Sequence, residues 1–296
     1  MKGNKTNERM IQANGVDLCI ETFGDPADPA ILLIGGAAAS MDWWEDEFCR
    51  RLATSDRHVI RYDLRDTGRS TSSEPGAPDY SQLDLAADAV GILDTLGIDQ
   101  AHIVGISMGA GIGQRLALEH PNRVASLTLF STSPGGPGGP DNPDLPPMSD
   151  RIKAMFSEPG PEPDWSNREA AIGAIVEGER TFAGTLAFDE AHVRSLAERI
   201  VDRTGNIASS MTNHWILEGD GPIRPRLGEI TAPALVLHGT ADPLFPYGHG
   251  EALARELSNA RLIPLEGGGH QYPHRTLWNI VIPAILEHTA PPITPT

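Results

Sequence analysis

A serine flanked by glycines is the residue of this 296-residue chain whose surroundings point most directly to chemistry. Ser107 stands in the pattern G-x-S-x-G, after a short apolar run and before a helix-like segment. At a sharp strand-to-helix turn, glycine neighbours give the backbone room and push the serine hydroxyl outward. The first amides of the helix then face the position where an oxyanion would form. With 31 glycines the pattern arises by chance about 0.2 times in such a chain, so its context must support it.

Two further residues supply the base and the acid that a nucleophilic serine needs. Asp242 and His270 each follow an apolar, strand-like run, and three glycines directly precede His270. An imidazole accepts the proton of the hydroxyl, and a carboxylate orients the imidazole and stabilises its charge. His274 is a possible alternative base, but the glycine run favours His270 because it lets the backbone lift that side chain. We therefore predict a triad of Ser107, His270 and Asp242.

The alternation of apolar runs with amphipathic segments predicts an α/β fold with a mostly parallel sheet and helices on both faces. The expected strands are residues 10–13, 16–23, 30–34, 58–62, 101–106, 126–130, 234–237 and 261–265. The expected helices are residues 44–53, 81–96, 108–120, 248–257 and 274–288. The run 16–23 alternates polar and apolar residues, which is typical of an antiparallel edge strand.

The segment 133–227 interrupts this alternation. It opens with the glycine- and proline-rich stretch 134–140 and continues with helical patterns that have no strand between them. An insertion of this kind between two strands predicts a helical lid, or cap, with 1–132 and 228–296 forming the core. The proline-rich tail 290–296 is expected to be disordered.

Composition excludes several classes of function. Forty acidic and 23 basic residues give a net charge of −17, which disfavours nucleic acid and anionic membranes as partners. No apolar run reaches the roughly 20 residues that span a bilayer. The polar start lacks a secretory signal, so a cytoplasmic location is expected. Cys19 and Cys49 are expected to be buried free thiols, and the histidines lack metal-ligand spacing. Neither a metal nor an organic cofactor is expected, and the oligomeric state stays open.

The chain resembles the α/β-hydrolase fold family, in which the order along the chain is serine, acid, histidine. Beside the triad, the segments that carry the resemblance are 24–30, 58–63, 65–70 and 85–90. The resemblance covers about residues 15–288 and is closest to aclacinomycin methylesterase-like bacterial esterases of anthracycline biosynthesis. It implies an eight-stranded mostly parallel sheet with a helical lid insertion, and a carboxylesterase-type serine hydrolase acting on a small-molecule ester. A methyl ester of an aromatic or polyketide-like molecule is one expected substrate.

The second oxyanion donor is expected from the loop after strand 30–34, where the family usually has His-Gly-x. Here the loop begins Gly35, Gly36, Ala37, and such small residues let the backbone approach a substrate carbonyl closely. We assign the backbone N–H groups of Ala37 and Met108 to the oxyanion hole. The expected pocket residues are Gly36, Trp43, Trp44 and Trp215.

Other functions use the same triad. A cofactor-free perhydrolase or haloperoxidase, a lactonase or a carbon–carbon bond hydrolase would differ only in the pocket and the lid. A catalytically silent protein on this fold would bind a ligand without turnover. Dehalogenases and epoxide hydrolases are disfavoured because those relatives have an aspartate where Ser107 stands.

Overall fold

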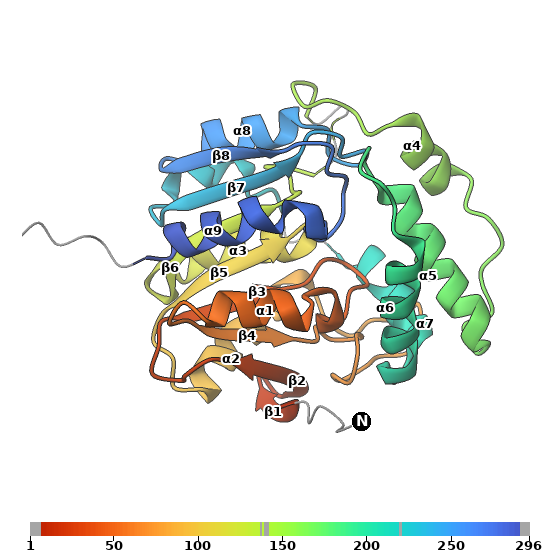
Figure 1. Ribbon diagram of the computed structural model, residues 1–296, viewed down its shortest axis with the longest axis horizontal. Coiled ribbons are helices and arrows are strands. Elements are labelled where there is room, and N and C mark those ends of the chain that lie inside the picture. Colours follow the sequence, from red (N-terminus) through yellow and green to blue (C-terminus); the bar gives the residue numbers. More distant parts are fainter. Residues whose placement is uncertain (1–6, 137, 139–141, 219–220, 291–296) are drawn as a thin grey trace, which may run out of the picture.

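A central sheet runs through the molecule (Figure 1). The computed structural model describes residues 7–136, 138, 142–218 and 221–290. These residues form one eight-stranded sheet with the order β1-β2-β4-β3-β5-β6-β7-β8. The strands are β1 (Arg9–Ala13), β2 (Val16–Phe23), β3 (Ala30–Ile34), β4 (His58–Tyr62), β5 (Ala101–Ile106), β6 (Val124–Phe130), β7 (Ala234–Gly239) and β8 (Ala260–Leu265). Strands β3 to β8 are parallel, which confirms the predicted mostly parallel sheet.

The eight expected strands are all present, and their ends agree with the prediction to within two residues. The fully apolar strand β3 is buried at every position, as both faces of the sheet are covered by helices. The expectation of an edge strand at 16–23 is wrong. β2 pairs antiparallel with β1 on one side and with β4 on the other, so β1 forms the edge.

Two helices cover one face of the sheet and three cover the other. α1 (Asp46–Ala53) and α9 (Trp278–His288) pack on one face, and α2 (Gln82–Thr95), α3 (Met108–Glu119) and α8 (Gly248–Glu256) pack on the opposite face. α1 and α9 begin later than expected because a 3-10 turn precedes each of them. Cys19 and Cys49 are buried and free, as predicted. None of the helices among the described residues has the length and apolar character needed to cross a membrane.

A group of helices lies between β6 and β7 in the chain and beside the carboxyl ends of the parallel strands, drawn in green in Figure 1. These helices are α4 (Asp150–Ser157), α5 (Arg168–Phe182), α6 (Glu190–Arg203) and α7 (Ile207–Thr212). α5 and α6 pack against each other through Ile172, Ile175, Ala197 and Ile200. That this insertion is a separate domain that acts as a lid stays a prediction. The predicted disordered tail lies almost wholly outside the described residues, and the stretch 134–140 lies partly outside them.

A buried cluster of charges joins the insertion to the core. Arg203, the last residue of α6, donates to Asp63 at 2.7 Å, to Asp42 at 3.2 Å and to Glu8 at 3.0 Å. The Arg203 side chain is 6% exposed and that of Asp63 is fully buried. Asp63 also accepts the backbone N–H of Met41 at 2.9 Å. Asp42 and Glu8 also pair with Arg199 and Arg69, so Arg203 is the cation that balances Asp63. Because these carboxylates belong to the core, their contacts with Arg203 anchor the end of α6.

We expect Arg203→Met to lower the free energy of unfolding by about 3 kcal/mol, because it leaves the buried carboxylate of Asp63 without a counter-charge. Urea denaturation near neutral pH measures this loss. The matched control is Arg168→Met, whose pair with Asp202 is exposed to solvent and should contribute much less to stability. Equal losses in the two variants would contradict an anchoring role for the buried cluster.

Candidate active site

Ser107 occupies the turn between β5 and α3 with φ of 51° and ψ of −117°. This left-handed backbone is rare for residues other than glycine and is typical of a strained nucleophile turn. A Cβ on Gly105 would lie 2.4 Å from the carbonyl oxygen of Gly109, and one on Gly109 would lie 2.3 Å from that of Gly35. Any side chain at these two glycines would force the backbone apart. The glycines of G-x-S-x-G are therefore required by close backbone contacts.

A continuous chain of hydrogen bonds links the three residues of the predicted triad. His270 Nε2 lies 3.0 Å from Ser107 Oγ, and His270 Nδ1 lies 2.9 Å from Asp242 Oδ2. The other carboxylate oxygen of Asp242 accepts the backbone N–H groups of Leu244 at 2.9 Å and Phe245 at 2.8 Å. Burial acts to raise the pKa of Asp242, but the adjacent His270 and these bonds hold that pKa below its usual value. The ionised carboxylate orients the ring so that Nε2 faces the serine hydroxyl.

The glycine run before His270 packs directly against the insertion. A Cβ on Gly269 would lie 2.2 Å from the backbone nitrogen of Gly184. Gly267 has a φ of 72°, in the region that favours glycine. The N–H of His270 donates to the carbonyl of Phe182 at 2.9 Å. The end of α5 therefore supports the backbone of His270.

The other histidines near the triad have different surroundings. His274 is the N-cap residue of the 3-10 turn Arg275–Leu277, and its Nδ1 is 2.7 Å from the hydroxyl of Thr276. His238 is fully buried, donates to the carbonyl of Phe245 at 2.7 Å and lies 3.8 Å from Asp242. Burial lowers the pKa of His238, so it is neutral. Within the described ranges, no three His, Cys, Asp or Glu side chains converge as metal ligands.

Two side chains fix the loop that follows β3. The hydroxyl of Tyr272 accepts the N–H of Gly36 at 3.0 Å, and Nδ1 of His214 accepts the N–H of Ala38 at 3.0 Å. His214 Nε2 donates to the carbonyl of Arg65 at 2.9 Å. Burial lowers the pKa of His214 to about 4, so the ring is neutral and can accept at Nδ1. The insertion, which contains His214, thus determines the shape of this loop.

Between these two occupied amides lies the N–H of Ala37. Among the hydrogen bonds of the described residues, none engages it. The N–H of Met108 is the first of helix α3 and has no partner within the helix. Ala37 and Ser107 line the same cavity, and Met108 directly follows the serine. The two amides predicted for the oxyanion hole are therefore free to bind an oxygen at this position.

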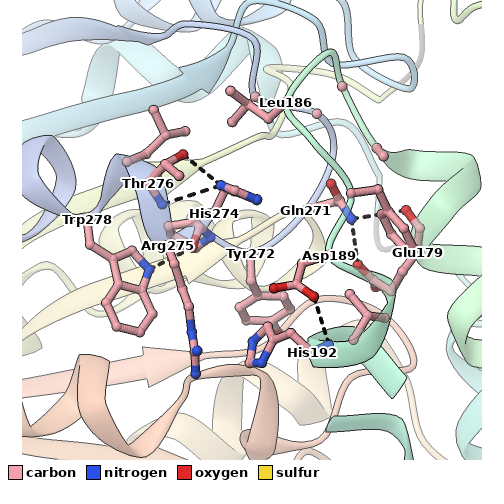
Figure 2. Close-up of a pocket in the computed structure, with 18 of the residues that line it drawn as sticks. Glu179, Leu186, Asp189, His192, Gln271, Tyr272, His274, Arg275, Thr276 and Trp278 are labelled. Carbon is pink, nitrogen blue, oxygen red and sulfur yellow. Dashed lines mark hydrogen bonds between the residues drawn. The ribbon is translucent and has the colours of Figure 1, made fainter. Parts of the chain in front are cut away.

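Two adjoining cavities lie beside this group. The smaller, of about 130 Å³, is lined by Ser107 and His270, and by the expected pocket residues Gly36, Trp43 and Trp215. The larger, of about 580 Å³, is shown in Figure 2 and is lined by Trp44, the remaining expected pocket residue. It does not reach the serine itself. The residues that line both cavities are Trp43, Glu179, Gln271 and Tyr272.

Sequence reasoning missed four of the side chains in this region. Gln271 and Tyr272 directly follow His270, so their position in that loop was a usable signal. Glu179 and His214 lie in the insertion, where no motif marks them. Only packing of the insertion against the core brings them to the cavities.

Comparison with known proteins places the chain in a family. The model of the alpha/beta hydrolase fold family matches residues 29–271. Rhodomycin D methylesterase DauP of Streptomyces sp. strain C5 is 33% identical over 95% of this chain and 97% of its own. Rhodomycin D methylesterase DnrP of Streptomyces peucetius is 34% identical with the same two coverages. The expected resemblance to bacterial methylesterases is confirmed.

A solved structure agrees at the level of the fold. The enol-lactonase from Burkholderia xenovorans LB400 superposes with a TM-score of 0.72 at 22% identity. The alignment covers 95% of this chain and 99% of the lactonase. With the family model, the relatives and the strand order in agreement, the chain belongs to the α/β-hydrolase fold family.

Proposed function

We propose that this protein is a carboxylesterase that hydrolyses a small-molecule ester, with a methyl ester as the favoured substrate. The unbroken series of hydrogen bonds from Asp242 through His270 to Ser107 is the observation that carries the proposal. The similarity to two rhodomycin D methylesterases supports the methyl ester. We further propose that it acts in the cytoplasm and needs neither a metal nor an organic cofactor.

The proposed reaction proceeds through an acyl-enzyme. Ser107 Oγ attacks the ester carbonyl while His270 Nε2 takes its proton, and Asp242 stabilises the imidazolium. The negative oxygen of the tetrahedral intermediate accepts the N–H groups of Ala37 and Met108. His270 returns its proton to the departing alcohol as the carbon–oxygen bond breaks. A water molecule, deprotonated by the same imidazole, then releases the acid and restores the serine.

His214 has a positioning role in this proposal. By accepting the N–H of Ala38, it keeps the neighbouring N–H of Ala37 directed at the cavity of Ser107. The histidine that many relatives carry in this loop is absent here. A histidine from the insertion and the hydroxyl of Tyr272 support the loop instead.

Ser107→Ala should lower the turnover of a methyl ester or a short p-nitrophenyl ester about 10⁶-fold, because the nucleophile is removed. Initial rates with enzyme in excess measure the residual activity. Ser195→Ala, at an exposed serine of α6, is the matched control and should hydrolyse at the normal rate. Full activity of the Ser107 variant would rule out the assignment.

His270→Gln should prevent covalent labelling of Ser107 by a fluorophosphonate, because the hydroxyl then has no base at 3.0 Å. Mass spectrometry of the labelled serine peptide provides the measurement. His274→Gln, which changes the nearby histidine outside the triad, should label normally. Persistent labelling of the His270 variant would show that another group activates the serine.

His214→Phe should lower kcat roughly 10²-fold with little change in KM, because the Ala37 amide loses its fixed orientation. His214→Gln, whose amide can both accept from Ala38 and donate to Arg65, should recover part of kcat. Steady-state kinetics on folded variants, checked by thermal melting, make the comparison. Equal kcat values for the Phe variant and the unmodified enzyme would contradict the positioning role.

A further inference from the structure

The larger cavity contains a carboxyl group that the ester chemistry does not use. We propose that Glu179 recognises a positively charged nitrogen on the body of the ester substrate, while the ester carbonyl of the same molecule lies at Ser107. This inference rests on the proposed esterase function and names the substrate class more closely.

Glu179 stands where the two cavities meet. It lies on α5, lines both cavities, and is fixed by Gln271, whose Nε2 donates to its Oε2 and to its backbone carbonyl, each at 3.0 Å (Figure 2). Gln271 follows His270 directly, so the carboxyl group is tied to the loop of the triad. In the part of the chain that the structure describes, no Lys, Arg or His forms an ion pair with Glu179.

The other carboxylates of the larger cavity already have partners. Glu45 pairs with the guanidinium of Arg275 and lies 3.1 Å from Nε2 of His192. Asp189 accepts the backbone N–H of His192 at 3.1 Å and lies at the amino end of α6, where the helix dipole favours a negative charge. Glu179 is therefore the carboxylate of this lining whose charge is left for a ligand to balance.

Removal from water makes the ionised form of Glu179 unfavourable when no cation is beside it. Burial raises the pKa of Glu179 to about 7, although the Gln271 hydrogen bond and the nearby His270 oppose the shift. A buried carboxylate gains most from a cation that enters the same low-dielectric space. Such a cation would also meet the aromatic rings of Trp43 and Tyr272, which stack at 6.0 Å between centroids and line both cavities.

The volumes of the two cavities agree with a substrate whose ester group lies at Ser107 and whose larger part lies beside Glu179. About 130 Å³ beside Ser107 accommodates the small end that carries the ester, and about 580 Å³ accommodates the body of a ligand. The two cavities adjoin at Glu179, Gln271 and Tyr272, and the proposal places one molecule across both of them. A charged nitrogen a few bonds from the ester would then lie beside Glu179.

Two methyl benzoates of equal shape test the proposal: one with a para trimethylammoniomethyl group and one with a para neopentyl group. The unmodified enzyme should prefer the cationic ester in kcat/KM by about tenfold or more, and Glu179→Gln should reduce that ratio about tenfold. The matched control is Glu177→Gln, at an exposed carboxylate of the same helix that pairs with Arg180, and it should keep the ratio. A ratio near one, or a ratio that Glu179→Gln leaves unchanged, would overturn the proposal.

The pH dependence of the ratio gives a second readout. The ammonium charge is permanent, so raising the pH from about 6 to about 8 ionises Glu179 and should increase the preference for the cation. The other titratable groups that face the carboxyl are His270 and Tyr272, and across the cavity His192 and His274. All four groups remain in Glu179→Gln, so any pH trend that they cause is also present in that variant. An equal pH trend in the unmodified enzyme and in Glu179→Gln would therefore overturn the role of Glu179.

An enzyme without esterase activity would give a different set of results. If neither ester is hydrolysed and the fluorophosphonate does not label Ser107, the catalytic proposal is wrong. Calorimetric binding of the same two esters to Ser107→Ala then decides the role of Glu179 without turnover. Tighter binding of the cationic ester, lost in Ser107→Ala/Glu179→Gln, supports the inference, and equal binding of both esters overturns it.

Discussion

The contact on which the site depends is the one between the first turn of α3 and the end of β3. A Cβ on Gly109 would lie 2.3 Å from the carbonyl oxygen of Gly35 and 2.5 Å from that of Ile34. This approach requires that β3 and β5 be neighbours in the sheet, as their parallel pairing shows. It brings Ser107 beside the loop that follows β3. One backbone contact thus fixes the position of Ser107 relative to the amide of Ala37. The close approach is accompanied by the positive φ of Ser107.

Close backbone contacts at glycines also bring His270 to Ser107. A Cβ on Gly239 at the end of β7 would lie 2.3 Å from the carbonyl oxygen of Gly268, and a Cβ on Gly269 would meet the backbone at Gly184. The loop after β8 is therefore pressed between a core strand and the insertion. Its direction is determined by backbone packing on both sides, so the imidazole of His270 reaches its two partners at hydrogen-bond distance. The position of the His270 imidazole is therefore determined mainly by the rigid backbone segments that pack around its loop.

Three polar side chains of the insertion, Arg203, His214 and Glu179, lie against the core or the cavities. Arg203 balances buried carboxylates of the core, His214 fixes the loop after β3, and Glu179 leaves an uncompensated charge between two cavities. Two of these interactions are internally satisfied, and the third is open to a ligand. Loss of contact between insertion and core would therefore change the loop after β3, the support of His270 and the polarity of the pocket together. In the proposed mechanism, this coupling would let the insertion affect both the rate and the specificity of the enzyme.

The sequence alone determined which elements form and which three side chains meet, since apolar runs specify buried strands and glycines mark the turns at Ser107 and His270. These are local signals, read within a few residues. The place of β2 inside the sheet was decided only when β1 paired beside it, and the shift of the start of α1 arose from a 3-10 turn. His214 and Glu179 had no signal in the chain at all. The groups that surround these two side chains come from segments far away in the sequence, as the contact between His214 and Ala38 shows. Tertiary packing buries both side chains, and this burial lowers the pKa of His214 and raises the pKa of Glu179.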